Sequence, residues 1–273
     1  EMRIYEGKQA RIKNVSVVGN TKTNDHVVLR EVRTKPGQLF SRSDIIRTQR
    51  ELSQFGYFNP EKLNVNPKPN PVDGTVDIEY IVEEKPSDQL ELSAGYSGFG
   101  VVGTLGLTFN NFSTRNIKDK KAWTPLPSGD GQRVSVRIQS NGPQYQGYNF
   151  SFTEPWLGGK KPNSFTVSAW HNRQASGLKY LRSKIDSSND SLDANGDKVR
   201  NTNRSYLYVT SLALSLGTRL KKPDDYFTLL HDVTIQHYDI KNWPVFVYSN
   251  GTANNLFYKV VLSRNSIDQP IYP

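Results

Sequence analysis

The stretch Ile81–Gly100, IVEEKPSDQLELSAGYSGFG, separates two kinds of sequence. Before it, helix-like and strand-like segments alternate, as in a small α+β domain. After it, one alternating apolar and polar segment follows another to the last residue, and none has helical spacing. The charged run Glu83–Asp88 joins the two parts. We therefore predict one domain over residues 1–86 and a second over residues 87–273, whose first strand is Gln89–Tyr96.

The first domain is predicted to open with a strand and a short helix. Residues 11–19 alternate apolar and polar side chains and end in Gly19-Asn20, which indicates a strand followed by a turn. Asn24 is a favourable N-cap for a short helix. Lys35-Pro36-Gly37 then interrupts the chain, because proline and glycine both disfavour continuing a helix.

A second helix and a hairpin complete the first domain. Ser41 or Ser43 is predicted to cap a helix whose apolar side chains recur at helical spacing as far as Phe55, with Gly56 as its C-cap. Two strands follow, at residues 63–65 and 75–82, and a loop rich in proline and asparagine joins them around Asp73-Gly74. The order is strand, helix, helix, strand, strand (βααββ).

These elements and their motifs resemble a POTRA domain along its whole length. The resemblance rests on the Gly19-Asn20 turn, the Pro36-Gly37 break, the FGYF sequence of residues 55–58 and the final VDIEYIVEEKP of residues 76–86. It implies that the side chains of these motifs maintain the fold. It also implies that function lies in backbone, where an edge strand can pair with an extended client. The residues predicted for this edge are Leu63, Asn64, Val65 and Asn66.

The second domain is predicted to be an antiparallel sheet with one apolar face. Eight segments of about ten residues alternate apolar side chains with small or polar ones, which is typical of a transmembrane β-barrel. The apolar positions are Leu90, Leu92, Ala94 and Tyr96; Leu105, Leu107 and Phe109; Val134, Val136 and Ile138; Tyr148, Phe150 and Phe152; Phe165, Val167 and Ala169; Leu212, Leu214 and Leu216; Phe227, Leu229, Val233 and Ile235; and Tyr258, Val260 and Leu262. A soluble β-sandwich is the alternative, although its strands are usually shorter.

The connections between these segments differ in length. If the first strand rises from the periplasm, the polar connections at residues 173–203 and 240–254 are expected to lie outside the cell. The connection at residues 111–131 would then be periplasmic. The sequence gives no physical reason for the length of this third connection.

A second resemblance covers most of the second domain. Residues 90–117, 125–136 and 148–170 and the terminal SRNSIDQPIYP of residues 263–273 are similar to the opening half of the barrel in the BamA family of outer-membrane assembly factors. The insertion at Lys118–Ser128 is similar to that of Bacteroidetes members. The family barrel has about sixteen strands, so we expect a POTRA domain followed by only about the first eight barrel strands. The family's inward-folded Val-Arg-Gly-Phe loop is not found, and we interpret the chain as a fragment.

The resemblance implies a function and a set of partners. The expected function is folding and insertion of β-barrel proteins into the bacterial outer membrane, with the POTRA domain in the periplasm. The expected partners are nascent β-barrel proteins, accessory lipoproteins of the assembly complex and outer-membrane lipid. The first barrel strand would be the edge of a lateral seam that templates client strands. Its residues are Gln89, Leu90, Glu91, Leu92, Ser93, Ala94, Gly95 and Tyr96. A POTRA-type two-partner secretion transporter and a soluble periplasmic β-rich scaffold are the alternatives.

Composition and motifs argue against several other functions. The chain has no cysteine, so disulfides and thiolate metal sites are excluded. The net charge of +9 is spread along the chain without a recognisable nucleic-acid motif, so we predict no nucleic-acid partner. The four histidines lack metal-ligand spacing, and no phosphate-binding loop or nucleophile elbow is found. We therefore expect no metal, no cofactor and no enzymatic activity.

Overall fold

The computed structural model describes residues 9–97, 100–123, 125–142, 144–175, 205–243 and 248–266. The chain divides into two compact units. The first unit contains the chain up to Asp88 together with Phe109–Gln132, and the second contains Gln89–Thr108 and Arg133–Asn265. A connection between two strands of the second unit thus belongs to the first unit.

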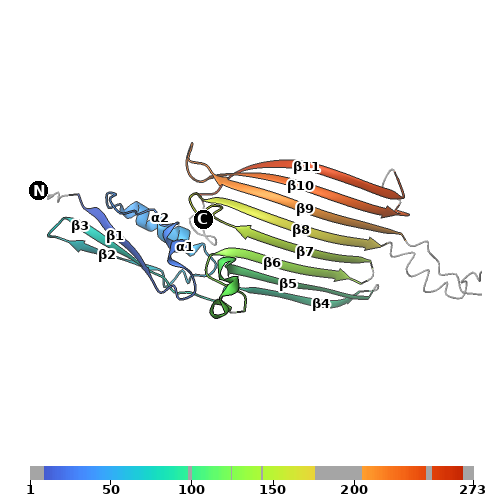
Figure 1. Cartoon of the computed structure of the whole chain (residues 1–273), viewed down its shortest axis with the longest axis horizontal. Coiled ribbons are helices and arrows are strands. Elements are labelled where there is room, and N and C mark those ends of the chain that lie inside the picture. Colours follow the sequence, from blue (N-terminus) through green and yellow to red (C-terminus); the bar gives the residue numbers. More distant parts are fainter. Residues whose placement is uncertain are drawn as a thin grey trace, which may run out of the picture. The chain divides into compact units, whose positions relative to one another are not determined.

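The first unit contains a three-stranded sheet and two helices (Figure 1). Its elements are β1 (Arg11–Val18), α1 (Asp25–Leu29), α2 (Arg42–Ser53), β2 (Asn64–Asn70) and β3 (Thr75–Ile81). The strand order is β1-β3-β2, with β1 parallel and β2 antiparallel to β3. The predicted order strand, helix, helix, strand, strand is therefore confirmed.

Both helices of the first unit pack on one face of this sheet. Alternate residues of β3, Val76, Ile78 and Tyr80, are buried against apolar side chains of the helices. Phe58, just after α2, is also fully buried and contacts Tyr57 edge to face. The Tyr80 hydroxyl lies 2.7 Å from the hydroxyl of Thr34, so this buried polar group has a hydrogen-bond partner.

The ends of the two helices correct part of the sequence prediction. Ser41 caps α2 by accepting a hydrogen bond from the Asp44 N–H at 3.3 Å, as one of the two predicted alternatives. Gly56 was expected to be the C-cap, but α2 ends earlier, at Gln54 in a right-handed conformation. Gly56 does not have the positive φ of a glycine cap. Asn24 lies at the N-cap position of α1, yet its side chain makes no capping hydrogen bond.

The strand β2 is longer than predicted. It runs to Asn70, so residues expected in a loop are paired with β3. The prolines at 67 and 69 are compatible with this pairing because β2 is an edge strand of the sheet, where a missing N–H on the outer side breaks no ladder bond. The loop between the two strands therefore shrinks to residues 71–74.

The second unit contains an eight-stranded antiparallel sheet, and Figure 1 shows its strands side by side in chain order. The strands are β4 (Gln89–Ser97), β5 (Gly100–Phe112), β6 (Gln132–Asn141), β7 (Tyr145–Glu154), β8 (Asn163–Ala175), β9 (Tyr206–Arg219), β10 (Phe227–Lys241) and β11 (Gly251–Arg264). Each of the eight predicted alternating segments is one of these strands. The segment between β5 and β6 contains two short 3₁₀ helices, η1 (Arg115–Lys118) and η2 (Lys120–Ala122).

The predicted connections of this unit are only partly described. Residues 176–203, 244–247 and 267–273 of the stretches discussed above lie outside the described residues. The connection expected at residues 240–254 is shorter than predicted, because β10 continues to Lys241 and β11 begins at Gly251. Polar residues such as Asn254 and Asn255, which suggested a loop, pair with β10 instead.

Candidate functional site at two sheet edges

The first predicted site, Gln89–Tyr96, lies entirely within β4 at one edge of the eight-stranded sheet. Within the described residues β4 pairs with β5 alone, in a register that runs from Gln89 opposite Thr108 to Ser97 opposite Gly100. Its apolar side chains are open to the surroundings, with Leu92 74% and Tyr96 82% exposed. The outer side of β4 is therefore a row of main-chain N–H and C=O groups without a neighbouring strand, which is the arrangement that accepts an added strand.

The inner side of β4 packs closely on glycines of β5. A Cβ atom on Gly103 would lie 2.9 Å from the main-chain oxygen of Ser93, and one on Gly106 would lie 3.1 Å from the Glu91 carboxylate. Glu91 in turn pairs with Arg137 of β6, with 2.9 Å between Oε1 and the guanidinium nitrogen. Both side chains are about half exposed, so this ion pair contributes little stability. Pairing with β5 depends mainly on the backbone ladder.

The second predicted site, Leu63–Asn66, lies at the edge strand β2. Leu63 immediately precedes the strand, and Asn64, Val65 and Asn66 are its first residues. Proline occupies positions 67, 69 and 71, and alternate residues of a strand direct their N–H groups to the same side. Pro67 and Pro69 are paired with β3 but have no N–H to donate to it. The main-chain N–H positions of this alternate series therefore point away from β3.

The same outward series also includes Val65, whose N–H is already bonded. It donates to the side-chain oxygen of Asn64 at 2.8 Å. The outer edge of β2 therefore offers carbonyl acceptors at Val65, Pro67 and Pro69 but no unoccupied N–H donor at these positions, and Pro71, just after the strand, continues the series. The two predicted edges differ in this respect, because β4 contains no proline.

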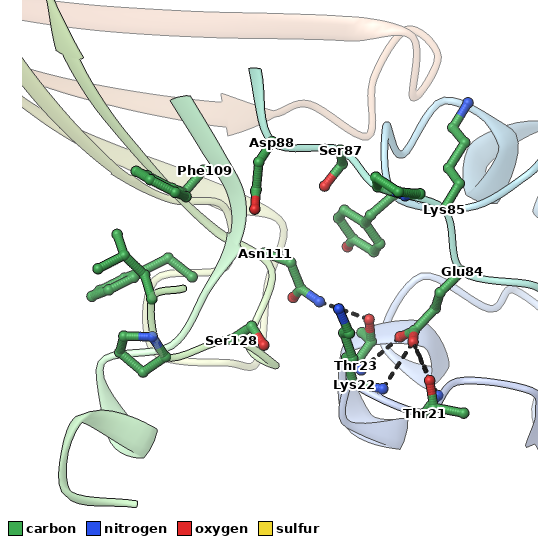
Figure 2. A pocket seen from close by; sticks show the side chains of 15 residues that line it. Thr21, Lys22, Thr23, Glu84, Lys85, Ser87, Asp88, Phe109, Asn111 and Ser128 are labelled. Carbon is green, nitrogen blue, oxygen red and sulfur yellow. Dashed lines mark hydrogen bonds between the residues drawn. The ribbon is translucent and has the colours of Figure 1, made fainter. Parts of the chain in front are cut away.

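A cavity of about 360 Å³ lies within the first unit, and Figure 2 shows the residues around it. One wall is the loop Thr21–Thr23, and another is the charged joint from Glu84 to Asp88. A third wall combines the end of β5 with the segment that follows it, and its residues are Phe109, Asn111, Phe112, Leu126, Pro127 and Ser128. Tyr57 completes the lining. Sequence reasoning did not find this cavity, because its walls come from segments far apart in the chain.

Glu84 fixes the loop beside this cavity. Its carboxylate accepts hydrogen bonds from the main-chain N–H groups of Thr21, Lys22 and Thr23 at 3.1, 2.8 and 2.7 Å, and from the Thr21 hydroxyl at 2.7 Å (Figure 2). Partial burial alone would raise the pKa of Glu84, but these donors outweigh it and hold the pKa below its usual value. The glutamate of the predicted joint is therefore a structural anchor.

This arrangement predicts how the first unit responds to acid. Because the pKa of Glu84 is lower in the folded state, its contribution to stability is complete above the unfolded-state pKa and is lost as the pH falls through the lower folded-state pKa. Glu84→Gln is expected to lower the stability by about 1–2 kcal/mol at pH 7 and to leave it unchanged near pH 2. Hydrogen exchange of the amides in β1, β2 and β3 measures the stability of the first unit at each of the two pH values. An equal loss at both pH values would contradict this role of the charge.

The apolar side chains of the second unit form continuous rows on one face of the sheet. Cross-strand register places Phe152, Val167, Leu214, Val233 and Tyr258 in one row across β7 to β11. Of these, Leu214 is 42% exposed, whereas Ala213 on the opposite face is buried. A sheet that exposes its apolar side chains and covers its small ones is suited to lipid contact.

A polar row limits this apolar band at one end. Four residues away along each strand, a second row on the same face as Leu214 crosses β8 to β11. Its members are His171, Thr210, His237 and Asn254. The His171 ring and the Thr210 hydroxyl are hydrogen-bonded at 2.8 Å, and the His237 ring and the Asn254 side chain at 2.7 Å. Each of these two histidines therefore has a hydrogen-bond partner on a neighbouring strand. Within the described residues, no three His, Asp or Glu side chains are grouped so as to hold a metal ion.

Helices in the part of the chain that the structure describes are all too short or too polar to cross a membrane.

Comparisons with known proteins agree with this architecture. Residues 10–85 match the family model "POTRA: Surface antigen variable number repeat". The outer membrane protein assembly factor BamA of Nitratidesulfovibrio vulgaris is 33% identical over 55% of this chain, and that of Neisseria meningitidis is 26% identical over 57%. Each alignment covers 18% of the relative, so the chain spans only part of the length of these proteins.

A solved structure extends the match to nearly the whole chain. The crystal structure of BamA from Haemophilus ducreyi lacking POTRA domains 1–3 covers 98% of this chain, with a TM-score of 0.59 and 17% identity, and 46% of that structure is matched. At this identity the likeness concerns the fold. The POTRA match, the related sequences and the barrel-like sheet together make this chain similar, in sequence and in fold, to the outer membrane protein assembly factors named BamA.

Proposed function

We propose that this chain takes part in folding β-barrel proteins and inserting them into the outer membrane, and that β4 is the edge on which client strands form. The observation that carries the proposal is the position of β4, which lies at the end of the described sheet and pairs on one side only. The sequence similarity supports it, because the matched relatives are named as outer membrane protein assembly factors.

Strand addition at β4 supplies its own driving force. An antiparallel partner along Gln89–Tyr96 would form about eight main-chain hydrogen bonds, each worth roughly 0.5–1.5 kcal/mol net. In lipid an unpaired main-chain group costs several kcal/mol, so a client strand gains more by pairing there than in water. The step therefore requires neither ATP nor a cofactor.

Other contacts belong to the same proposal. Leu63–Asn66 can contribute carbonyl acceptors to a client or an accessory lipoprotein, but the bonded Val65 N–H and the following prolines restrict full pairing there. The apolar rows of β7 to β11 support contact with outer-membrane lipid. The domain limits at residues 86 and 87 are proposed from the sequence. The compact units do not follow these limits throughout, because Phe109–Gln132 belongs to the first unit.

Site-specific cross-linking tests the proposal. A photo-reactive amino acid at Leu92 in the intact protein is expected to form adducts with newly made β-barrel proteins. The matched control is the same amino acid at Leu212, which is also exposed but lies on β9, between two paired strands. Adducts of Leu92 with a secreted, non-barrel protein alone would instead indicate a two-partner secretion transporter. Equal labelling at both positions would argue against a special role of β4.

A further inference from the structure

The connector, defined here as residues 109–132, lies between β5 and β6 in the chain. It consists of the last residues of β5, the two 3₁₀ helices η1 and η2, and the segment that enters β6. Its described residues form one compact unit with the POTRA domain. The length that the sequence left unexplained is thus used to pack this connection against the POTRA domain.

Hydrogen bonds join the connector to the loop before α1. The Asn24 N–H donates to the main-chain oxygen of Gly129 at 2.9 Å. The Asn111 side-chain NH₂ donates to the Thr23 hydroxyl at 2.8 Å, and its oxygen accepts the Gly131 N–H at 2.9 Å. The Asn111 amide therefore links the POTRA loop to the connector's own backbone.

Asp130 is the centre of this contact. The residue is only 4% exposed, and its carboxylate accepts hydrogen bonds from the Asn24 amide at 3.0 Å and from the Ser113 hydroxyl at 2.7 Å. The His26 ring lies 3.5 Å from the same carboxylate, and Arg30 donates to the Asp130 main-chain oxygen at 3.3 Å. A buried carboxylate is costly without such partners. The Arg115 guanidinium of the connector lies 3.8 Å from the carboxylate, so three of these five partners come from the POTRA domain.

Two glycines allow the connector to approach this closely. Gly131 has a φ of +71°, and a Cβ there would lie 3.0 Å from Val27 and 3.1 Å from the Tyr57 hydroxyl. Gly129 has a φ of +133°, and a Cβ there would lie 3.1 Å from the Lys22 main-chain oxygen. Both conformations favour glycine, and both positions leave little room for a side chain. The Gly129-Asp130-Gly131 sequence is therefore fitted to the POTRA surface.

We propose that Gly129-Asp130-Gly131 is a clamp that attaches the POTRA domain to the chain between β5 and β6. The domain is joined covalently to β4 through Glu83–Asp88, and the clamp adds a non-covalent contact between the domain and the connector. Because the joint already keeps the partners together, at an effective concentration on the order of millimolar, a few well-placed hydrogen bonds suffice to close it. This inference is independent of the function proposed for β4.

A disulfide between Thr23→Cys and Asn111→Cys reports the closed clamp. Residues 1–273 contain no cysteine, and the Thr23 hydroxyl and the Asn111 side-chain nitrogen that are replaced lie 2.8 Å apart, so the two new cysteines are placed to form a disulfide when the clamp is closed. Under mild oxidation of the intact protein the pair is expected to cross-link, and adding Asp130→Ala is expected to slow the reaction at least tenfold. The matched control is Asp119→Ala. Asp119 lies in the same connector, where it caps η2 by accepting the Lys121 N–H.

A reciprocal exchange separates loss of the clamp from loss of folding. Asn24→Asp places two carboxylates together and is expected to slow cross-linking as Asp130→Ala does. Combining Asn24→Asp with Asp130→Asn restores one amide and one carboxylate and is expected to recover most of the rate. Equal rates with Asp130→Ala and Asp119→Ala, or an exchange that recovers nothing, would overturn the proposal.

Discussion

Proline introduced into β4 is expected to stop client insertion even where it leaves the β4–β5 ladder intact. Successive residues of a strand direct their N–H groups to opposite sides, so of Ser93→Pro and Ala94→Pro one removes a donor facing β5 and the other a donor facing outward. If clients pair with the outer edge, both variants lose insertion, by an order of magnitude or more. The measurement is the rate at which a β-barrel client folds in membranes containing each variant.

Alanine replacements provide the matched comparison for these prolines. Ser93→Ala changes the side chain but keeps the N–H, and it is expected to leave the insertion rate within about twofold, since main-chain groups are proposed to do the pairing. Hydrogen exchange of the β5 amides identifies which proline preserves the ladder. Normal client insertion by that variant would contradict the role assigned to the β4 edge.

Arginine in the centre of the apolar band is expected to destabilise the membrane-inserted sheet strongly. Leu214 lies in a row of apolar side chains that crosses five strands, and charge on a lipid-facing position near the bilayer centre costs about 2–4 kcal/mol. Leu214→Arg should therefore lower the free energy of unfolding from lipid by that amount. Denaturant titration of the intact protein in bilayers measures the change.

Thr210→Arg is the matched control for this prediction. Thr210 lies on the same strand and face, four residues from Leu214, but in the polar row with His171 and His237. If this row lies at the membrane interface, arginine there should cost only about 0–1 kcal/mol. Similar losses from both substitutions would mean that the face of β9 does not follow the depth of a bilayer.

The strands of the second unit could be predicted because a sheet with one lipid-facing side has apolar residues at every second position of its sequence. Leu212, Leu214 and Leu216 alternate with small or polar neighbours, and this period of two is sufficient to place β9 and its face. Long strands with one apolar face indicate a barrel wall without any tertiary information. The edge position of β4 followed from being first in that series.

What the sequence did not show depends on contacts between distant residues. The Asn24 side chain was expected to cap α1, but it bonds to Asp130, 106 residues further along the chain. Gly129-Asp130-Gly131 has the composition of an ordinary turn, so nothing local marked it as an attachment. The prolines after Val65 suggested a loop, because proline usually interrupts strands, and only the pairing with β3 shows their edge position.

The alternating prolines of β2 have a consequence for the order of events in the periplasm. An unfolded client presents many strand segments, and any donor-rich edge that it meets first would compete for them and hold them in a non-productive complex. An edge whose alternate N–H groups are missing or already bonded captures such segments only weakly. If clients pair with β4 as proposed, such an edge would let the POTRA domain remain close to them without becoming a kinetic trap, and β4 would keep the advantage in pairing with them.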